Sequence, residues 1–76
     1  MYTPTRYWRE IVGAISDETL DLWIANAEHS IPQLKVVASK SEPDSPVLKT
    51  IEIEEGDLKL YLEEKDRRQK LKLVAP

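Results

Sequence analysis

The sequence predicts an α+β fold, in which two or three N-terminal helices pack on one face of a three-stranded antiparallel meander. In the first forty residues, apolar side chains recur every three or four positions, as on one face of a helix. From Val47 onward, apolar and charged residues alternate, which is typical of strands with one buried face. We therefore divide the single small domain 1–76 into a helical half 1–40, a loop 41–46 and a strand half 47–75.

The composition is that of a small globular domain. Charged residues make up 33% of the 76 residues and apolar residues 41%, which does not match a disordered chain. There is no cysteine, so disulfides, thiol catalysis and thiolate metal sites are excluded. No apolar run approaches the roughly 18 residues of a membrane span, and the first residues show no signal-peptide pattern. We expect a cytoplasmic protein that makes no membrane contact.

The first predicted helix begins with Thr3 as N-cap and Pro4 at the first helical position, where a missing N–H costs nothing. Its apolar face has helical spacing and consists of Trp8, Ile11, Val12 and Ile15. Gly13 lies inside this pattern and weakens it by about 1 kcal/mol relative to alanine. We expect the helix to end or bend there.

The second predicted helix begins after Ser16, an N-cap residue followed by two acids that suit the positive end of a helix dipole. Its apolar face is Leu20, Trp23, Ile24 and Ala27. Ser30 and Gln33 form a potential capping box, which predicts a third helix over 31–39, with a strand as the alternative there. The loop 41–46 contains two prolines and no apolar residue.

The strand half is predicted from a register that satisfies both faces of a sheet. With Gly56 and Asp57 as a two-residue hairpin loop, Ile51 lies opposite Leu62, and a second turn at 65–68 carries the pairing onward. The same register brings apolar side chains together on one face and opposite charges together on the other. The predicted buried face consists of Val47, Ile51, Ile53, Leu58, Leu60, Leu62, Leu71 and Leu73.

Helix is the competing interpretation for 58–73. Glu63 with Arg67, and Glu64 with Arg68, have the i,i+4 spacing of ion pairs on a helix. The leucines at every second position from 58 to 62 favour a strand instead.

No residue pattern predicts catalysis, a cofactor or a metal site. His29 is the only histidine and has no recognisable nucleophile beside it. Two glycines in the whole chain cannot build a phosphate-binding loop. The acids around Gly56 are interpreted as the solvated face of a strand and its turn. Side chains along one strand face diverge, so their carboxylates do not surround a cation.

Charge is distributed unevenly along the chain. Residues 65–72 hold five basic groups and one acid, whereas residues 1–64 hold six basic and thirteen acidic groups. The basic residues are candidate contacts for nucleic acid or for a partner: Lys65, Arg67, Arg68, Lys70 and Lys72. Three helices followed by a basic hairpin resemble the general layout of a winged-helix protein. The predicted third helix, however, offers only Gln33 and Lys35 to read base edges.

The predicted function is a non-enzymatic protein–protein interaction module, such as a regulator, an inhibitor or a complex subunit. The candidate surface for a protein partner is the solvated face of the sheet, with Glu52, Glu54, Lys59, Tyr61 and Glu63. The open edges 47–54 and 69–75 would also allow a homodimer to form by strand pairing. The alternatives are nucleic-acid binding through the basic turn and mimicry of DNA by the acidic body.

Overall fold

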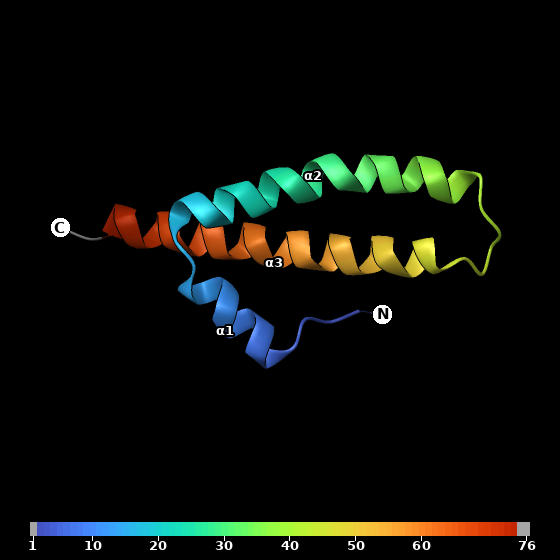
Figure 1. The fold of residues 1–76 in the computed structure, drawn as a ribbon. Helices are drawn as coiled ribbons and strands as arrows, with labels where there is room; N and C mark the ends of the chain where they lie inside the picture. The colour runs from blue at the N-terminus through green and yellow to red at the C-terminus, as the bar shows by residue number, and fades with distance from the viewer. Residues whose placement is uncertain (1, 75–76) are drawn as a thin grey trace.

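The computed structural model describes residues 2–74, which form three α-helices (Figure 1). Helix α1 spans Arg6–Ala14, α2 spans Asp17–Ser39 and α3 spans Pro46–Val74. Helices α2 and α3 form a long antiparallel hairpin, and α1 packs beside α3. Residues 2–74 contain no strand. The predicted α+β fold and its antiparallel meander are therefore wrong, and so is a homodimer formed through an edge strand.

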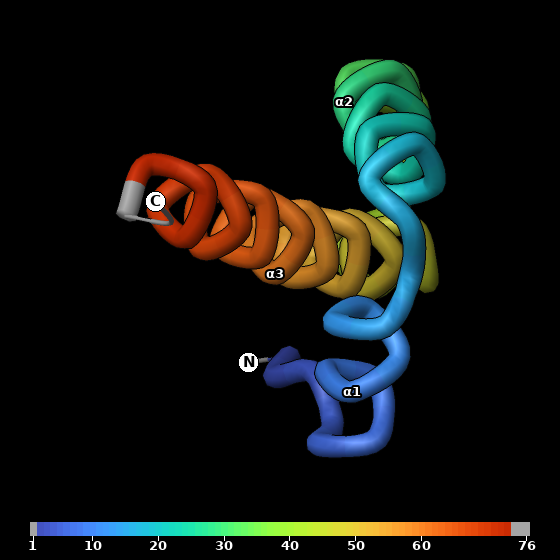
Figure 2. Tube along the Cα trace, turned by 90° about the vertical axis from the view of Figure 1, so that its left-hand side faces the viewer, coloured from blue at the N-terminus to red at the C-terminus, as the bar shows by residue number. Residues whose placement is uncertain are grey.

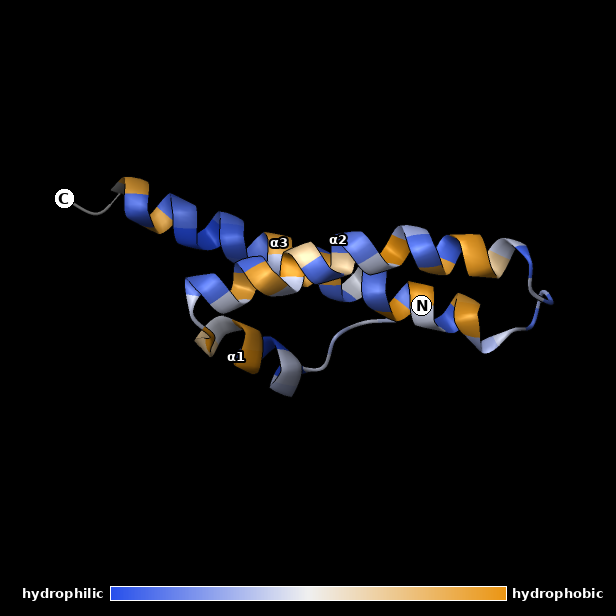
Figure 3. Ribbon diagram, turned by 45° about the horizontal axis from the view of Figure 1, so that its top comes forward, coloured by the Kyte–Doolittle hydropathy of each residue, from blue (hydrophilic) through white to orange (hydrophobic). Residues whose placement is uncertain are grey.

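Helices α2 and α3 pack along a seam, which we define as the line of residues on each helix that face the other. These residues are spaced alternately three and four positions apart. In α2 these residues are Leu20, Ile24, Ala27, Ile31, Leu34 and Ala38. In α3 they are Val47, Ile51, Glu54, Leu58, Tyr61, Lys65, Arg68 and Lys72. This spacing keeps one side of each helix against its neighbour. The α3 seam is mainly apolar at first and basic later, and Figure 3 shows how hydrophilic the C-terminal half of α3 is.

The alternation that predicted strands has a helical explanation. Because α3 meets α2 on one side and α1 on another (Figure 2), its apolar residues do not form a single stripe. Leu60 is buried, whereas Leu62 is 46% exposed. Among the i,i+4 pairs that favoured a helix, Arg68 does bind Glu64, at 2.6 Å. Ile51 and Leu62, predicted to be cross-strand neighbours, are three turns apart on one helix.

The core lies where all three helices meet. Its buried residues are Val12, Leu20, Ile24, Leu60 and Tyr61. The rings of Trp8 and Trp23 stack with their centroids 5.5 Å apart, and Tyr61 lies 5.7 Å from Trp23. Burial, with the nearby carboxylates of Asp57 and Glu54, raises the pKa of Tyr61 to about 12. The two tryptophans thus share one core, as their helical spacing predicted.

The helix starts agree only partly with the sequence prediction. Ser16 is confirmed as the N-cap of α2, since its hydroxyl accepts a hydrogen bond from the Thr19 amide at 3.1 Å. The predicted cap at Thr3 is wrong, because Thr5 caps α1 by accepting from the Trp8 amide.

Residues 31–39 are helical, as predicted, but they belong to α2, which continues through Pro32. The separate third helix and its capping box are therefore wrong. Proline in a helix interior removes one backbone hydrogen bond. The helix continues nevertheless, with Ile31 buried immediately before the proline. His29 consequently lies within α2, exposed and 3.0 Å from the Gln33 amide nitrogen, and not at a junction between helices.

The molecule is elongated, with principal extents of 53 × 23 × 16 Å. The loop between α2 and α3 lies near its predicted position, since α3 begins at Pro46. In Figure 2 the C-terminal end of α3 diverges from α2. None of the helices in residues 2–74 combines the length and the apolar character that crossing a membrane requires.

The two glycines lie inside helices and provide a matched test of the packing. We expect Gly13→Ala to raise the free energy of unfolding by up to about 1 kcal/mol through helix propensity, because open space surrounds that position. A β-carbon at Gly56 would lie 2.5 Å from Cδ2 of Tyr2. Gly56→Ala should therefore raise the free energy of unfolding less than Gly13→Ala does, or lower it. The Tyr2 ring must move away, and its hydroxyl then loses the hydrogen bond to Asp57.

Urea unfolding followed by circular dichroism measures both variants. As a control, Gly56→Ala placed in a Tyr2→Ala background should recover the helix-propensity gain. Equal stabilisation by the two single variants would contradict the close approach of Tyr2 to α3.

Candidate functional site

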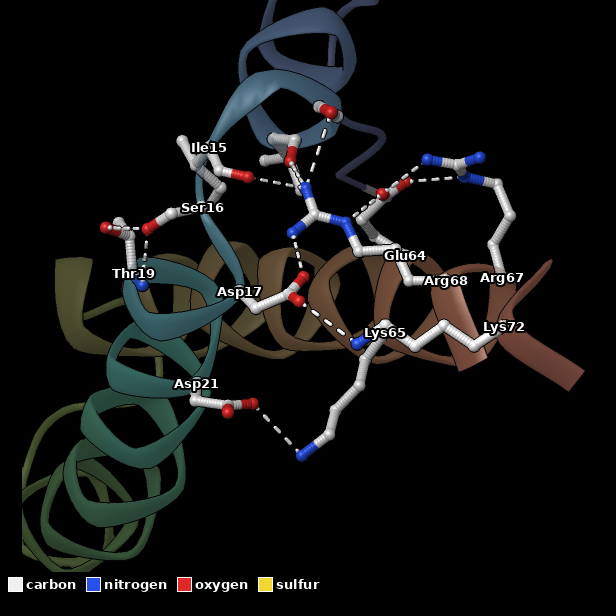
Figure 4. A network of polar contacts seen from close by, with 12 residues as sticks. Ile15, Ser16, Asp17, Thr19, Asp21, Glu64, Lys65, Arg67, Arg68 and Lys72 are labelled. Carbon is white, nitrogen blue, oxygen red and sulfur yellow. Dashed lines mark hydrogen bonds and ion pairs between the residues drawn. The ribbon is translucent and has the colours of Figure 1, made fainter. Parts of the chain in front are cut away.

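The basic segment of α3 lies against the C-terminal end of α1 and the first turn of α2 (Figure 4). Arg68 is at its centre, with a side chain only 15% exposed. Its Nη2 donates to the carbonyl of Ile15 at 2.7 Å and, over longer distances, to those of Val12 and Gly13. Its Nη1 donates to Asp17 at 2.9 Å, and its Nε donates to Glu64 at 2.6 Å. One guanidinium thus connects three helices.

This arrangement follows from the chemistry of helix ends. The last carbonyls of an α-helix have no partner within the helix and carry partial negative charge. Helix α1 ends without a basic residue in its last turn. Arg68 supplies the missing donors from α3, because a guanidinium presents five N–H groups in a fixed plane.

The other four predicted basic residues are also paired with acids. Lys65 lies 3.0 Å from Asp21, and Lys72 lies 3.1 Å from Asp17, so both join α3 to α2. Arg67 pairs with Glu64 at 2.7 Å, and Lys70 pairs with Asp66 at 2.9 Å, both within α3. The predicted basic turn is instead a segment of α3, so its residues are distributed around the helix: three of them face α2, and Arg67 and Lys70 lie on another side. Each of the five already has a carboxylate partner.

These pairs shift the pKa values of the acids. Hydrogen bonds from Arg67 and Arg68 lower the pKa of Glu64 below its ordinary value of 4.5. Hydrogen bonds from Arg68 and Lys72 lower the pKa of Asp17 below 3.8. Both carboxylates thus favour the charged form in the folded state.

The residues predicted to share a solvated sheet face are dispersed around α3. Tyr61 is buried under the tryptophans, and Glu52 accepts a hydrogen bond from the backbone nitrogen of Tyr2 at 2.7 Å. Lys59 and Glu63 remain neighbours, one turn apart on α3. Residues two positions apart would share one face of a strand, but on a helix they point in nearly opposite directions, because each residue turns by 100°.

Lys59 and Glu63 border an open groove between α2 and α3, which is the most apolar of the surface hollows and is therefore our candidate site. The groove has a volume of about 530 Å³ and a mainly apolar surface. Its floor is Ile31, Leu58 and Leu62, and its charged rim is Glu55, Lys59, Glu63 and Asp66. We call these seven residues the α2–α3 groove.

The rim carries three acids and one base. Lys59 and Glu63 make no ion pair with any of residues 2–74. Glu55 is 3.6 Å from Lys35 of α2, with both side chains more than half exposed, and Asp66 pairs with the exposed Lys70. The groove therefore combines an apolar floor with acidic groups that are free or only weakly engaged.

The groove lies on the side of α3 roughly opposite α1. At 100° per residue, Glu55, Leu62 and Asp66 share one side of α3, whereas Asp57 and Leu60 point the other way. That other side is covered, since Asp57 accepts hydrogen bonds from Tyr2 at 2.7 Å and from the Trp8 indole at 3.1 Å.

The sequence contained a signal for this site that the strand interpretation concealed. Leu58 and Leu62 are four residues apart, and acids recur around them at helical spacing. The sequence prediction placed both leucines inside a sheet core and treated the acids as strand surface. The contribution of Ile31 depends on how α2 folds back, which no local pattern gives.

The fold and the groove define a small three-helix domain with an open apolar groove between α2 and α3. Comparison with protein-family models, with curated proteins and with solved structures found no match. Within residues 2–74, no three acids or histidines converge in a way that could hold a metal ion.

Replacing Arg68 should destabilise the whole domain. We expect Arg68→Ala to lower the free energy of unfolding by about 2–4 kcal/mol, because it removes charge-assisted hydrogen bonds and leaves half-buried acceptors without a donor. Arg67→Ala, which removes only one half-exposed partner of Glu64, should cost less than about 1 kcal/mol. Urea unfolding measures both variants. Similar losses from the two would contradict the central role of Arg68.

Acid should weaken the same network. A carboxylate whose pKa is lowered by folding stabilises the protein above its unfolded pKa, and this contribution disappears as pH falls through the folded value. For Glu64, stability should therefore decline as pH drops below 4.5. Glu64→Gln should flatten this decline, whereas Glu42→Gln, in the loop, should leave it unchanged. Unfolding free energies measured between pH 3 and pH 6 test the difference, and equal slopes in the two variants would refute it.

Proposed function

We propose that this protein is a small non-enzymatic module that binds another protein through the α2–α3 groove. The observation that supports this function is an apolar floor left open in a domain that covers its other side. Leu62 is 46% exposed although it lies in the middle of α3. Exposed apolar patches rimmed by polar groups are typical of interaction sites.

The energetics favour an occupied groove. Fully burying a leucine side chain contributes about 1.5–3 kcal/mol. Leu62 is 46% exposed, whereas Leu58 is already partly buried and Ile31 is buried, so covering the floor would supply about 1–2 kcal/mol of the roughly 8 kcal/mol of a micromolar affinity. The hollow is also large enough to accept several side chains of a partner.

Nucleic-acid binding has less support. Strong binding requires basic groups that are available to phosphates, and all five candidate residues of α3 have acidic partners. The winged-helix layout that motivated this alternative depended on strands that residues 2–74 do not form. We further propose that the module acts in the cytoplasm, which suits a chain without cysteine.

Site-specific photo-crosslinking tests the proposed function. We expect benzoylphenylalanine in place of Leu62 to form a discrete protein adduct in cells of the source organism. The same group in place of Leu22, which is 58% exposed on α2 and outside the groove, should not form that adduct. Circular dichroism checks that both variants fold. No adduct at Leu62, or the same adduct at both positions, would refute binding through the groove.

A further inference from the structure

We propose that the occupant of the α2–α3 groove is an amphipathic helix of a partner protein, with basic residues at both ends of its apolar stripe. The inference rests on the proposed function and adds the chemistry of the partner. It follows from three features of the groove: its shape, its position relative to α1, and its charges.

The shape of the groove suits a helix. Its rim extends along α3 from Glu55 to Asp66, about 16 Å at 1.5 Å per residue, or three helical turns. An extended peptide needs partners for its backbone N–H and C=O groups, and residues 2–74 have no strand edge to provide them. A helix satisfies its own backbone, so it needs only apolar side chains for the floor.

Helix α1 shows how a helix packs against this hairpin. It places Trp8 and Val12 against Leu60 and Tyr61 on one side of α3. In Figure 2, α1 and α2 lie on different sides of α3. The groove occupies a further side of α3, bounded by Ile31 of α2. A partner helix there would pack between α2 and α3 as an additional helix of the bundle.

The charges specify the ends of that helix. Glu55 lies at one end of the rim, and Glu63 and Asp66 lie at the other. Glu63 has no cationic partner among the described residues, and Glu55 and Asp66 have only exposed ones. Lysine or arginine at both ends of the partner's stripe would complement these acids. Lys59, between them, favours a single acid near the middle of the partner helix.

A second copy of this chain fits the groove less well. Two grooves placed face to face would bring together six rim carboxylates and only two lysines. Like charges across an interface oppose association. The net charge of −3 for the whole chain also favours a basic partner over another copy.

Three stapled helical peptides test this inference. They share one leucine stripe and differ only in flanking residues, which are lysine and arginine, glutamine, or glutamate. Fluorescence anisotropy in low salt should show the basic peptide binding at least tenfold more tightly than the acidic one, with the preference shrinking as salt increases.

Protein variants locate the binding. Leu62→Glu should abolish binding of every peptide, whereas Glu42→Lys, a charge change in the α2–α3 loop, should alter the affinities less than twofold. Glu63→Lys combined with Asp66→Lys should weaken the basic peptide about tenfold and strengthen the acidic one. Because a misfolded protein would not gain affinity for the acidic peptide, the stronger binding of that peptide shows that the variant is folded and that its charges select the partner.

The outcomes separate this inference from the proposed function. If all peptides bind equally and Leu62→Glu abolishes binding, the basic partner is refuted and binding through the groove stands. If no peptide binds while the Leu62 photo-crosslink forms, the helical occupant is refuted. If neither is seen, both proposals fail. A dimer in sedimentation velocity that Leu62→Glu dissociates would assign the groove to a second copy and would also overturn the inference.

Discussion

One guanidinium fixes where α1 lies on the α2–α3 hairpin. Arg68 donates to carbonyls at the end of α1, to Asp17 at the start of α2 and to Glu64 on its own helix. The connection between α1 and α2 is only two residues long, so the chain must turn sharply beside α3. By binding both ends of that turn, Arg68 fixes where α1 packs. The aromatic core lies where α1 packs, and the groove lies on the other side of α3.

The sequence predicted the first two helices because their signals are local. Ser16 is a strong cap with two acids behind it, and the spacing of Trp8 and Trp23 placed both rings on apolar faces that meet. The start of the first helix was misplaced because two threonines flank Pro4, and Thr5, not Thr3, provides the cap. The predicted break before residue 31 is wrong, because α2 continues through Pro32 with Ile31 buried beside it.

The second half was mispredicted for a specific physical reason. Helix α3 packs on two sides, so Leu60 faces the core near α1 while Leu58 lies at the α2 seam and the groove. Leucines two residues apart then imitate the alternation of a strand. Gly56 strengthened this impression by resembling a hairpin turn. In the structure, Gly56 is helical, and its missing side chain makes room for the ring of Tyr2. Only long-range contacts with α1 and α2 distinguish the two interpretations.

The seam between α2 and α3 combines apolar contacts and ion pairs, which respond differently to salt. Near the loop the contacts are between aliphatic side chains, whereas near the start of α2 ion pairs of Lys65 and Arg68 with aspartates are added to the apolar contacts of Leu20. Dissolved salt screens exposed ion pairs but hardly affects apolar contacts. We therefore expect added salt to loosen the hairpin from the end where α2 begins, while the aliphatic contacts near the loop remain.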